Sequence, residues 1–377
     1  MTDRAQESHD KALLTARDGL AVVRIAATVD WGLEAVKQEG SKEIVFARAS
    51  AIVLACGIRT SIRNSDWRDD IALFSSAITI SPQSFKTHKE LAYAFYCRYQ
   101  EMPPDRRDHS DVEFAIQEGQ KALAVLEAKP LPEFYQTSMV YLHLGVYYRL
   151  KGDIFAQRNP EEGRLWYQKS LQMLKKGIPA DRALNEGNRT KELARGRKPD
   201  QIADVGDPNI YAELGVSYAR LGQYPEALQA LLYRRHLASG DSNSYADIAS
   251  IYMLTGQRTD AAVALLQALL LDDGRKDVLQ SLVDLYRQVD DQRCAIVPAS
   301  DRATPKFNVN CPLVHRHLCS AYLGLVQVFL DAKQWGLARK AEVAALNRYD
   351  CGDEQLPERR SVKPTTKTGA VKGYRRQ

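Results

Sequence analysis

The segment 311–319 holds the densest set of reactive side chains in the sequence, with Cys311, His315, His317 and Cys319 close together. On a helix, Cys311, His315 and Cys319 follow one another at intervals of four residues, so neighbouring pairs could bind one metal ion. Cys311 and Cys319 would lie two turns apart, roughly 12 Å, so all three could share an ion only if the first turn unwound. Cys294 could add a further ligand.

Ordinary packing is the competing interpretation of this segment. Apolar residues separate its cysteines and histidines, and cysteine is itself a common core residue. The six cysteines of the chain are few and scattered, and they include no CxxC pair. That pattern is unlike a disulfide scaffold, a zinc ribbon or a thioredoxin-type motif. We therefore expect no metal and no cofactor.

No other motif in the sequence indicates catalysis. A glycine-rich phosphate loop, a serine elbow and an HExxH pair are all absent from the printed sequence. The carboxylate pairs 69–70 and 272–273 fall at the ends of expected helices, where capping or solvation is the usual role. We therefore expect a protein that is not an enzyme.

Composition and charge indicate a globular chain with a basic tail. The 377 residues are 45% hydrophobic and 26% charged, with a formal net charge of +5. Residues 352–377 carry seven positive and three negative side chains, hence +4 of that total, and we expect them to be disordered. The remaining charge gives no reason to expect nucleic-acid binding. The longest apolar runs reach about half of the ~20 residues of a membrane span, so we expect a soluble, cytoplasmic protein, with membrane association as the alternative.

A repeat of 34 residues organises the centre of the chain. The segment that begins at Asp207 recurs from Asp241, with tyrosine, leucine or isoleucine, small residue, tyrosine and glycine at matching positions. The matched pairs are Tyr211 and Tyr245, Leu214 and Ile248, Gly215 and Ala249, Tyr218 and Tyr252, Gly222 and Gly256, and Ala227 and Ala261. A third copy supplies Leu279, Leu282, Val283 and Tyr286 at the same step.

The repeated positions predict a pair of antiparallel helices. Residues 211, 214, 215 and 218 share one helix face, and the small residue lets a second helix approach closely. Gly222 would end the first helix, and Ala227, Leu231 and Arg234 would share one stripe of the second. Such a pair cannot bury both faces alone, so the pairs must stack on one another.

This period and pattern resemble the tetratricopeptide repeat, over roughly residues 60–348. The resemblance implies an all-α, right-handed α-solenoid of tetratricopeptide-type helix pairs, five or six in number. Insertions at 98–111, 177–206 and 289–310 break the phase, and we expect irregular loops there. We expect residues 1–42 to form an N-terminal capping helix region, 43–351 the solenoid and 352–377 the tail.

A second resemblance covers residues 51–74, where an apolar helix is followed by Arg59, Thr60, Arg63, Asn64 and Trp67. Membrane glycosyltransferases of the O-mannosyltransferase type pass from their last membrane helix into C-terminal tetratricopeptide repeats in a similar way. Their multi-span catalytic body is not in this sequence. The resemblance implies a detached repeat arm that docks to a membrane-embedded partner. The alternative is that 44–58 is simply the first helix of the first repeat.

The predicted binding site is the concave groove, lined by first-helix residues beside the packing stripe. Such a surface suits an extended or helical peptide with apolar anchors, because tyrosine supplies contact area at a low entropic cost. Tetratricopeptide proteins that hold a C-terminal carboxylate use Lys, Asn and Arg here, and this chain has tyrosine and valine at several of those positions. The alternative is that the tyrosines only pack between repeats and that Arg149 is solvated. The predicted groove residues are Lys89, Tyr93, Tyr96, Leu142, Val146, Arg149, Ala212, Val216 and Ser250.

The resulting prediction is a non-catalytic scaffold or adaptor that binds a protein or peptide partner in this groove. The sequence leaves the partner, the pathway and the oligomeric state open.

Overall fold

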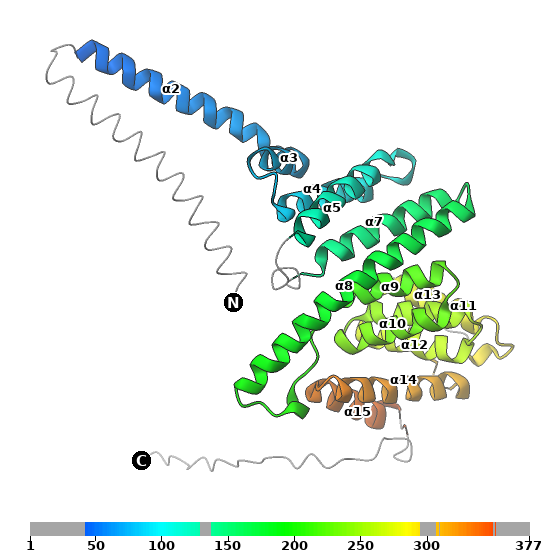
Figure 1. Cartoon of the computed structure of the whole chain (residues 1–377). Coiled ribbons are helices and arrows are strands. Elements are labelled where there is room, and N and C mark those ends of the chain that lie inside the picture. Colours follow the sequence, from blue (N-terminus) through cyan, green and yellow to red (C-terminus); the bar gives the residue numbers. More distant parts are fainter. Residues whose placement is uncertain (1–41, 129–136, 295–306, 309, 350, 352–377) are drawn as a thin grey trace, which may run out of the picture. The chain divides into compact units, whose positions relative to one another are not determined.

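The computed structural model describes residues 42–128, 137–294, 307–308, 310–349 and 351. Within these residues every regular element is a helix (Figure 1). The predicted N-terminal cap lies outside the described residues except for residue 42, and the predicted disordered tail lies outside them entirely. The chain divides into two compact units, Met1–Ile80 and Ser81–Gln377, and each is described by itself. The domain boundaries expected from the sequence stay predictions.

The described part of the first unit consists of α2 (Lys42–Asp66) and α3 (Asp70–Ile80). Asp69 begins α3, because its carboxylate accepts a hydrogen bond from the backbone N–H of Ala72 at 2.8 Å. No residue of α3 is buried. The apolar side chains Val53, Leu54 and Ile58 of α2 are all more than half exposed. This unit therefore presents apolar side chains to its surroundings.

The described part of the second unit contains five antiparallel helix pairs and one further helix, α13, which packs on α12. Its helices are α4 (Phe85–Glu101), α5 (Ser110–Glu127), α7 (Met139–Ala156), α8 (Pro160–Ala194), α9 (Pro208–Arg220), α10 (Tyr224–Leu237), α11 (Ser242–Leu254), α12 (Arg258–Leu271), α13 (Lys276–Tyr286), α14 (Pro312–Asp331) and α15 (Trp335–Tyr349). Each pair packs on the next, α5 against α7, α8 against α9, and α10 against α11. The predicted all-α solenoid of tetratricopeptide-type helix pairs is thereby confirmed.

Small residues permit the close helix approach that the repeat predicts. A Cβ atom added at Gly145 would lie 2.5 Å from the side chain of Leu174, and one at Gly215 would lie 2.6 Å from Leu231. Both distances are shorter than a Cβ atom normally makes with a non-bonded atom, so the leucine side chain would have to shift to admit a larger residue. The small residue at this position, which is Ala249 in the next repeat, therefore gives the two helices their close contact.

The turns inside the pairs use left-handed residues. Gly222 and Gly256, 34 residues apart, both have φ of 75°. The N–H after each glycine bonds back across the helix end, from Gln223 to the carbonyl of Tyr218 at 2.9 Å and from Gln257 to that of Tyr252 at 2.8 Å. This arrangement is the Schellman motif.

The predicted loop at 177–206 is wrong in its first half, because α8 continues through this stretch to its end at residue 194. Asp181 is buried and accepts hydrogen bonds from the backbone N–H of Asp207 (2.6 Å) and the hydroxyl of Tyr211 (2.9 Å). One turn further on, the side-chain oxygen of Asn185 accepts from the N–H of Val205 at 2.9 Å. The chain before α9 therefore returns along the extension of α8, and these bonds hold the extension in place.

One helix of the described residues, α14, has the length and apolar character needed to cross a membrane. Its apolar segment is 56% buried within the protein, as in the core helix of a folded domain. Its side chains Val314, Leu318 and Ala321 are inaccessible to solvent, and they belong to the hydrophobic core that runs from α10 to α15.

Candidate functional site

The first helices of successive pairs touch one another, α4 with α7, α7 with α9, and α9 with α11. They form a continuous surface, here called the first-helix surface. It is the face that the sequence predicted as the binding groove. Its N-terminal end carries four aromatic rings, and its later part carries small and half-buried residues.

Four rings from α4 and α7 form what we call the α4–α7 aromatic cluster: Tyr93, Tyr96, His143 and Tyr147. The ring of Tyr93 stacks on His143 with centroids 5.2 Å apart, and Tyr96 lies 5.6 Å from Tyr147. Tyr93 and Tyr96 lie three residues apart on α4, and His143 and Tyr147 lie four apart on α7, so the two rings of each helix share one face. Tyr93 is 42% exposed, whereas Tyr147 is almost completely buried, so the cluster reaches from solvent into the core.

Two polar atoms in the cluster have no hydrogen-bond partner in the described part of the chain. They are Nδ1 of His143 and the hydroxyl oxygen of Tyr147, and both atoms are buried. Leaving a buried polar group unpaired costs about 1 to 3 kcal/mol, so such groups are rare in a finished core. Side-chain atoms of Arg234, Ser239 and Gln334 are likewise buried without a partner in the described residues.

The cluster is uncharged near neutral pH. Burial, with a further contribution from Lys89, lowers the pKa of His143 to about 4, so its imidazole is neutral. Burial raises the pKa of Tyr147 well above its usual value, which keeps the phenol protonated. The cluster therefore offers aromatic area and hydrogen bonds without charge.

The two predicted cations of the groove are both paired. Nε of Arg149 lies 2.6 Å from Glu213 on α9, and its Nη1 lies 2.9 Å from Asp153. Lys89 lies 2.8 Å from Glu90. The alternative of a solvated Arg149 is wrong, because the side chain is largely buried and links α7 to α9.

The structure places the remaining groove residues as follows. Val146, Ala212 and Val216 are half-buried on the first-helix surface, and Ser250 is exposed, its hydroxyl donating to the carbonyl of Ala246 at 3.0 Å. Leu142 is the exception, because it is 5% exposed and packs in the core that α7 shares with α8 and α9. Its place in the predicted groove lining is wrong.

Sequence reasoning missed His143 and Tyr147 as members of the site. They follow the predicted positions Leu142 and Val146 by one residue each. The spacing of four residues between His143 and Tyr147, which places both rings on one face of a helix, was the signal that could have found them.

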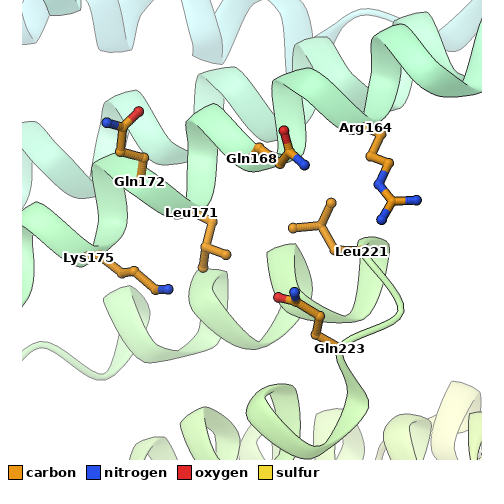
Figure 2. A pocket seen from close by; sticks show the side chains of 7 residues that line it. All are labelled: Arg164, Gln168, Leu171, Gln172, Lys175, Leu221 and Gln223. Atoms are coloured by element: carbon orange, nitrogen blue, oxygen red, sulfur yellow. The ribbon is translucent and has the colours of Figure 1, made fainter.

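A hollow lies between α8 and the turn that joins α9 to α10, with a volume of about 290 Å³. Figure 2 shows its lining, with side chains from α8 on one side and the turn residues on the other. The lining residues are Arg164, Gln168, Leu171, Gln172, Lys175, Leu221 and Gln223. Of these only Leu171 is buried, and none has a buried polar atom that lacks a partner. This hollow lacks the unpaired buried groups that mark the aromatic cluster.

The cysteine–histidine segment does not assemble into a metal site. Cys311 is bonded to Cys294, and Cys319 to Cys351, so these sulfurs are not thiolate ligands. The imidazole of His315 donates to the carbonyl of Tyr349 at 2.7 Å. No group of His, Cys, Asp and Glu in the described residues has the arrangement to hold a metal ion. Cys311 and Cys319 are buried, as the packing interpretation of this segment expects, but the inference from the scattered cysteines that they are unlike a disulfide framework is wrong for four of them.

No protein-family model matches the chain, and no curated protein sequence matches it. Solved structures that align with it include TTC0263, a thermophilic TPR protein of Thermus thermophilus, at 17% identity and a TM-score of 0.39 over 63% of this chain and 95% of that one. YrrB, described as a TPR protein with an unusual peptide-binding site, aligns at 14% identity and a TM-score of 0.37, over 71% and 97% of the two chains. MamA aligns at 15% identity and a TM-score of 0.36, over 58% and 95%.

At these low similarities, the fold is shown by the chain's own geometry. Helix pairs run through the second unit, and from α9 to α12 they repeat at 34 residues, with a small residue where the two helices touch and a left-handed glycine in the turn. The second unit is thus built of tetratricopeptide-type helix pairs.

Proposed function

We propose that this protein is a non-catalytic interaction scaffold that holds a segment of a partner protein against the α4–α7 aromatic cluster. The observation that carries the proposal is the coincidence of an exposed ring, Tyr93, with two unpaired buried polar atoms beneath and beside it. Such a site suits a peptide that brings an apolar or aromatic side chain together with a backbone or amide hydrogen-bonding group.

The chemistry of the cluster also limits the kind of peptide. Because Arg149 and Lys89 are already paired with carboxylates, no predicted groove cation is available to hold a terminal carboxylate. An acidic ligand would have to break the Arg149–Glu213 contact between α7 and α9. We therefore infer a neutral, partly apolar segment as the ligand.

The partner would bind without a cofactor, through ring stacking and hydrogen bonds. Tyr93 stacks on His143, so a partner ring or apolar group that packs on the exposed part of Tyr93 extends this stack. The small and half-buried residues further along, including Ala212, Val216 and the exposed Ser250, would accommodate the rest of the segment.

The test is partner capture by the full chain and by the Tyr93→Glu variant, with bound proteins identified by mass spectrometry. We expect the variant to lose the partner while its helical signal and melting temperature stay close to those of the wild-type chain. Gln168→Glu is the matched control, because it adds the same charge at an exposed position in the α8 hollow. Capture that survives in Tyr93→Glu, or that is lost equally in Gln168→Glu, would move the site away from the cluster.

A second candidate function is docking of α2 to a membrane-embedded partner, as the resemblance at 51–74 implies. The observation in its favour is the exposure of Val53, Leu54 and Ile58, which is unusual for clustered apolar side chains. The double variant Leu54→Lys/Ile58→Lys tests it. Loss of a membrane fraction from the captured material would support this function, and unchanged capture would refute it.

A further inference from the structure

We propose that this protein folds and works in an oxidising compartment, where two disulfide bonds close its C-terminal helix pair. The proposal goes beyond the binding function and does not depend on it. It concerns Cys294, Cys311, Cys319 and Cys351, which the fold brings together as two separate pairs.

The positions of the four cysteines give α14 a cross-link to the chain before it and another to the chain after it. Cys294 follows α13 and Cys311 directly precedes α14, so the first bond joins the chain before and after residues 295–310. Cys319 lies within α14 and Cys351 follows α15, so the second bond ties the two helices of the last pair. The Cα atoms of the pairs are 5.0 and 5.6 Å apart, inside the range that a disulfide requires.

Neighbouring contacts hold the second bond in register. The imidazole of His315, one turn before Cys319, donates to the carbonyl of Tyr349, two residues before Cys351. The backbone N–H of Cys351 donates to the carbonyl of Ala345 at 3.2 Å. The end of the last helix is thus fixed against α14 by hydrogen bonds as well as by sulfur.

Burial marks these bonds as structural rather than catalytic. The exposed fractions of the four cysteines are 2%, 0%, 4% and 3% in chain order. A catalytic or regulatory disulfide must be reached by an attacking thiolate, which these sulfurs are not. The two other cysteines, exposed Cys56 and half-buried Cys97, remain thiols.

The compartment follows from redox chemistry. Glutathione and thioredoxin keep cytosolic thiols reduced, and stable structural disulfides persist in secreted, lumenal and periplasmic proteins. The two buried disulfide bonds therefore argue against the cytoplasmic location predicted from the sequence. The partner of the first-helix surface would then have to be present in the same oxidising compartment.

The formation of each disulfide bond needs a two-electron oxidant, which another disulfide can supply. In each pair the two thiols lose two protons and two electrons as the sulfur–sulfur bond forms. A disulfide-bearing oxidoreductase or oxidised glutathione accepts both, and its own disulfide is reduced to two thiols. Two such exchanges form both disulfide bonds.

The experiment is a thiol count on the full chain taken from the cells that make it. Free thiols are alkylated at the moment of lysis, the protein is denatured, and its mass and non-reducing digest are measured. We expect two alkylated residues, Cys56 and Cys97, and two linked peptides that join 294 to 311 and 319 to 351. After reduction all six cysteines should react.

The control is a Cys56→Ser/Cys97→Ser chain, for which we expect no alkylation before reduction and an unchanged melting temperature. Six reactive thiols in the wild-type protein at lysis would overturn the proposal. Linked peptides with exchanged partners would also overturn it, because the pairing is what the fold specifies.

Discussion

The α4–α7 aromatic cluster and the α14–α15 pair belong to the same series of helix pairs, but only the second is cross-linked by disulfide bonds. In the cluster, Tyr93 is exposed and polar atoms of His143 and Tyr147 have no partner. At the α14–α15 pair, Nδ1 of His317 shares a 2.6 Å hydrogen bond with the hydroxyl of Tyr286 and two disulfides cross-link the chain, while Trp335 is exposed and the side-chain oxygen of Gln334 is buried without a partner. The comparison teaches that helix pairs of one repeat architecture can differ in whether disulfide bonds cross-link them.

This difference follows from the side chains rather than from the backbone. One disulfide fixes the start of α14 to the chain after α13, and the other fixes α14 to the residue that follows α15. In the α4–α7 aromatic cluster, we propose instead that the unpaired polar atoms of His143 and Tyr147 find their partners in the bound segment.

The largest expected effect is a loss of stability on removal of the Cys319–Cys351 disulfide bond. Cys351→Ser removes the bond to Cys319, which spans 32 residues of sequence, and should lower the free energy of unfolding by about 2 to 4 kcal/mol. Denaturant unfolding without reductant measures the loss, and Cys56→Ser, at an exposed thiol, is the control. Partner capture at low temperature should persist. If Cys351→Ser were as stable as the wild-type chain, the terminal pair would not depend on the bond.

A smaller effect separates the roles of the ring and the hydroxyl at Tyr93. Tyr93→Ala removes the stacked ring and should weaken partner binding roughly 10- to 100-fold, the range of an aromatic anchor at an interface. Tyr93→Phe keeps the ring and should change affinity less than about threefold. Calorimetric titration with the identified partner gives both numbers. Equal losses in the two variants would assign the binding energy to the hydroxyl instead.

A third expected effect, similar in size to the second, is a pH dependence of stability that comes from His143 in the α4–α7 aromatic cluster. His143 has a pKa lowered to about 4 in the folded protein, against 6.5 when exposed. Between these values the unfolded chain binds a proton that the folded chain does not, so stability falls as the pH is lowered from about 6.5 to about 4. Above 6.5 this residue adds no dependence.

His143→Phe keeps a ring under Tyr93 and removes the titration. The loss of stability across this pH window should then be smaller by roughly 1 to 3 kcal/mol than in the wild-type chain. Urea unfolding at a series of pH values measures the difference. Identical pH profiles for the two proteins would mean that His143 titrates as an exposed histidine.

Local patterns in the sequence predict the repeat well. Gly215 and Gly222 were assigned to helix contact and helix end from spacing alone, and the structure has them in both roles. These roles depend on residues within one helix pair, and a 34-residue period displays them directly. The exposure of Tyr93 follows from the same register.

Contacts between distant residues could not be predicted in this way. The pairing of Arg149 with Glu213 joins residues 64 positions apart, and no local pattern indicates it. The helical extension of α8 depends on Asp181, whose partners lie beyond the turn that follows. Leu142 is buried because α8 and α9 both pack against its side of α7, which the repeat register alone does not show.

The most direct test of the binding surface is site-specific photo-crosslinking. A benzophenone amino acid replaces Tyr93 in one chain and Trp335, half exposed at the start of α15, in another. Each chain is irradiated with the captured partner, and the linked peptides are sequenced. We predict a crosslink from position 93 to a single neutral, partly apolar segment of the partner, and none from position 335. A crosslink from position 335 with none from position 93 would contradict the assignment of the α4–α7 aromatic cluster as the binding site.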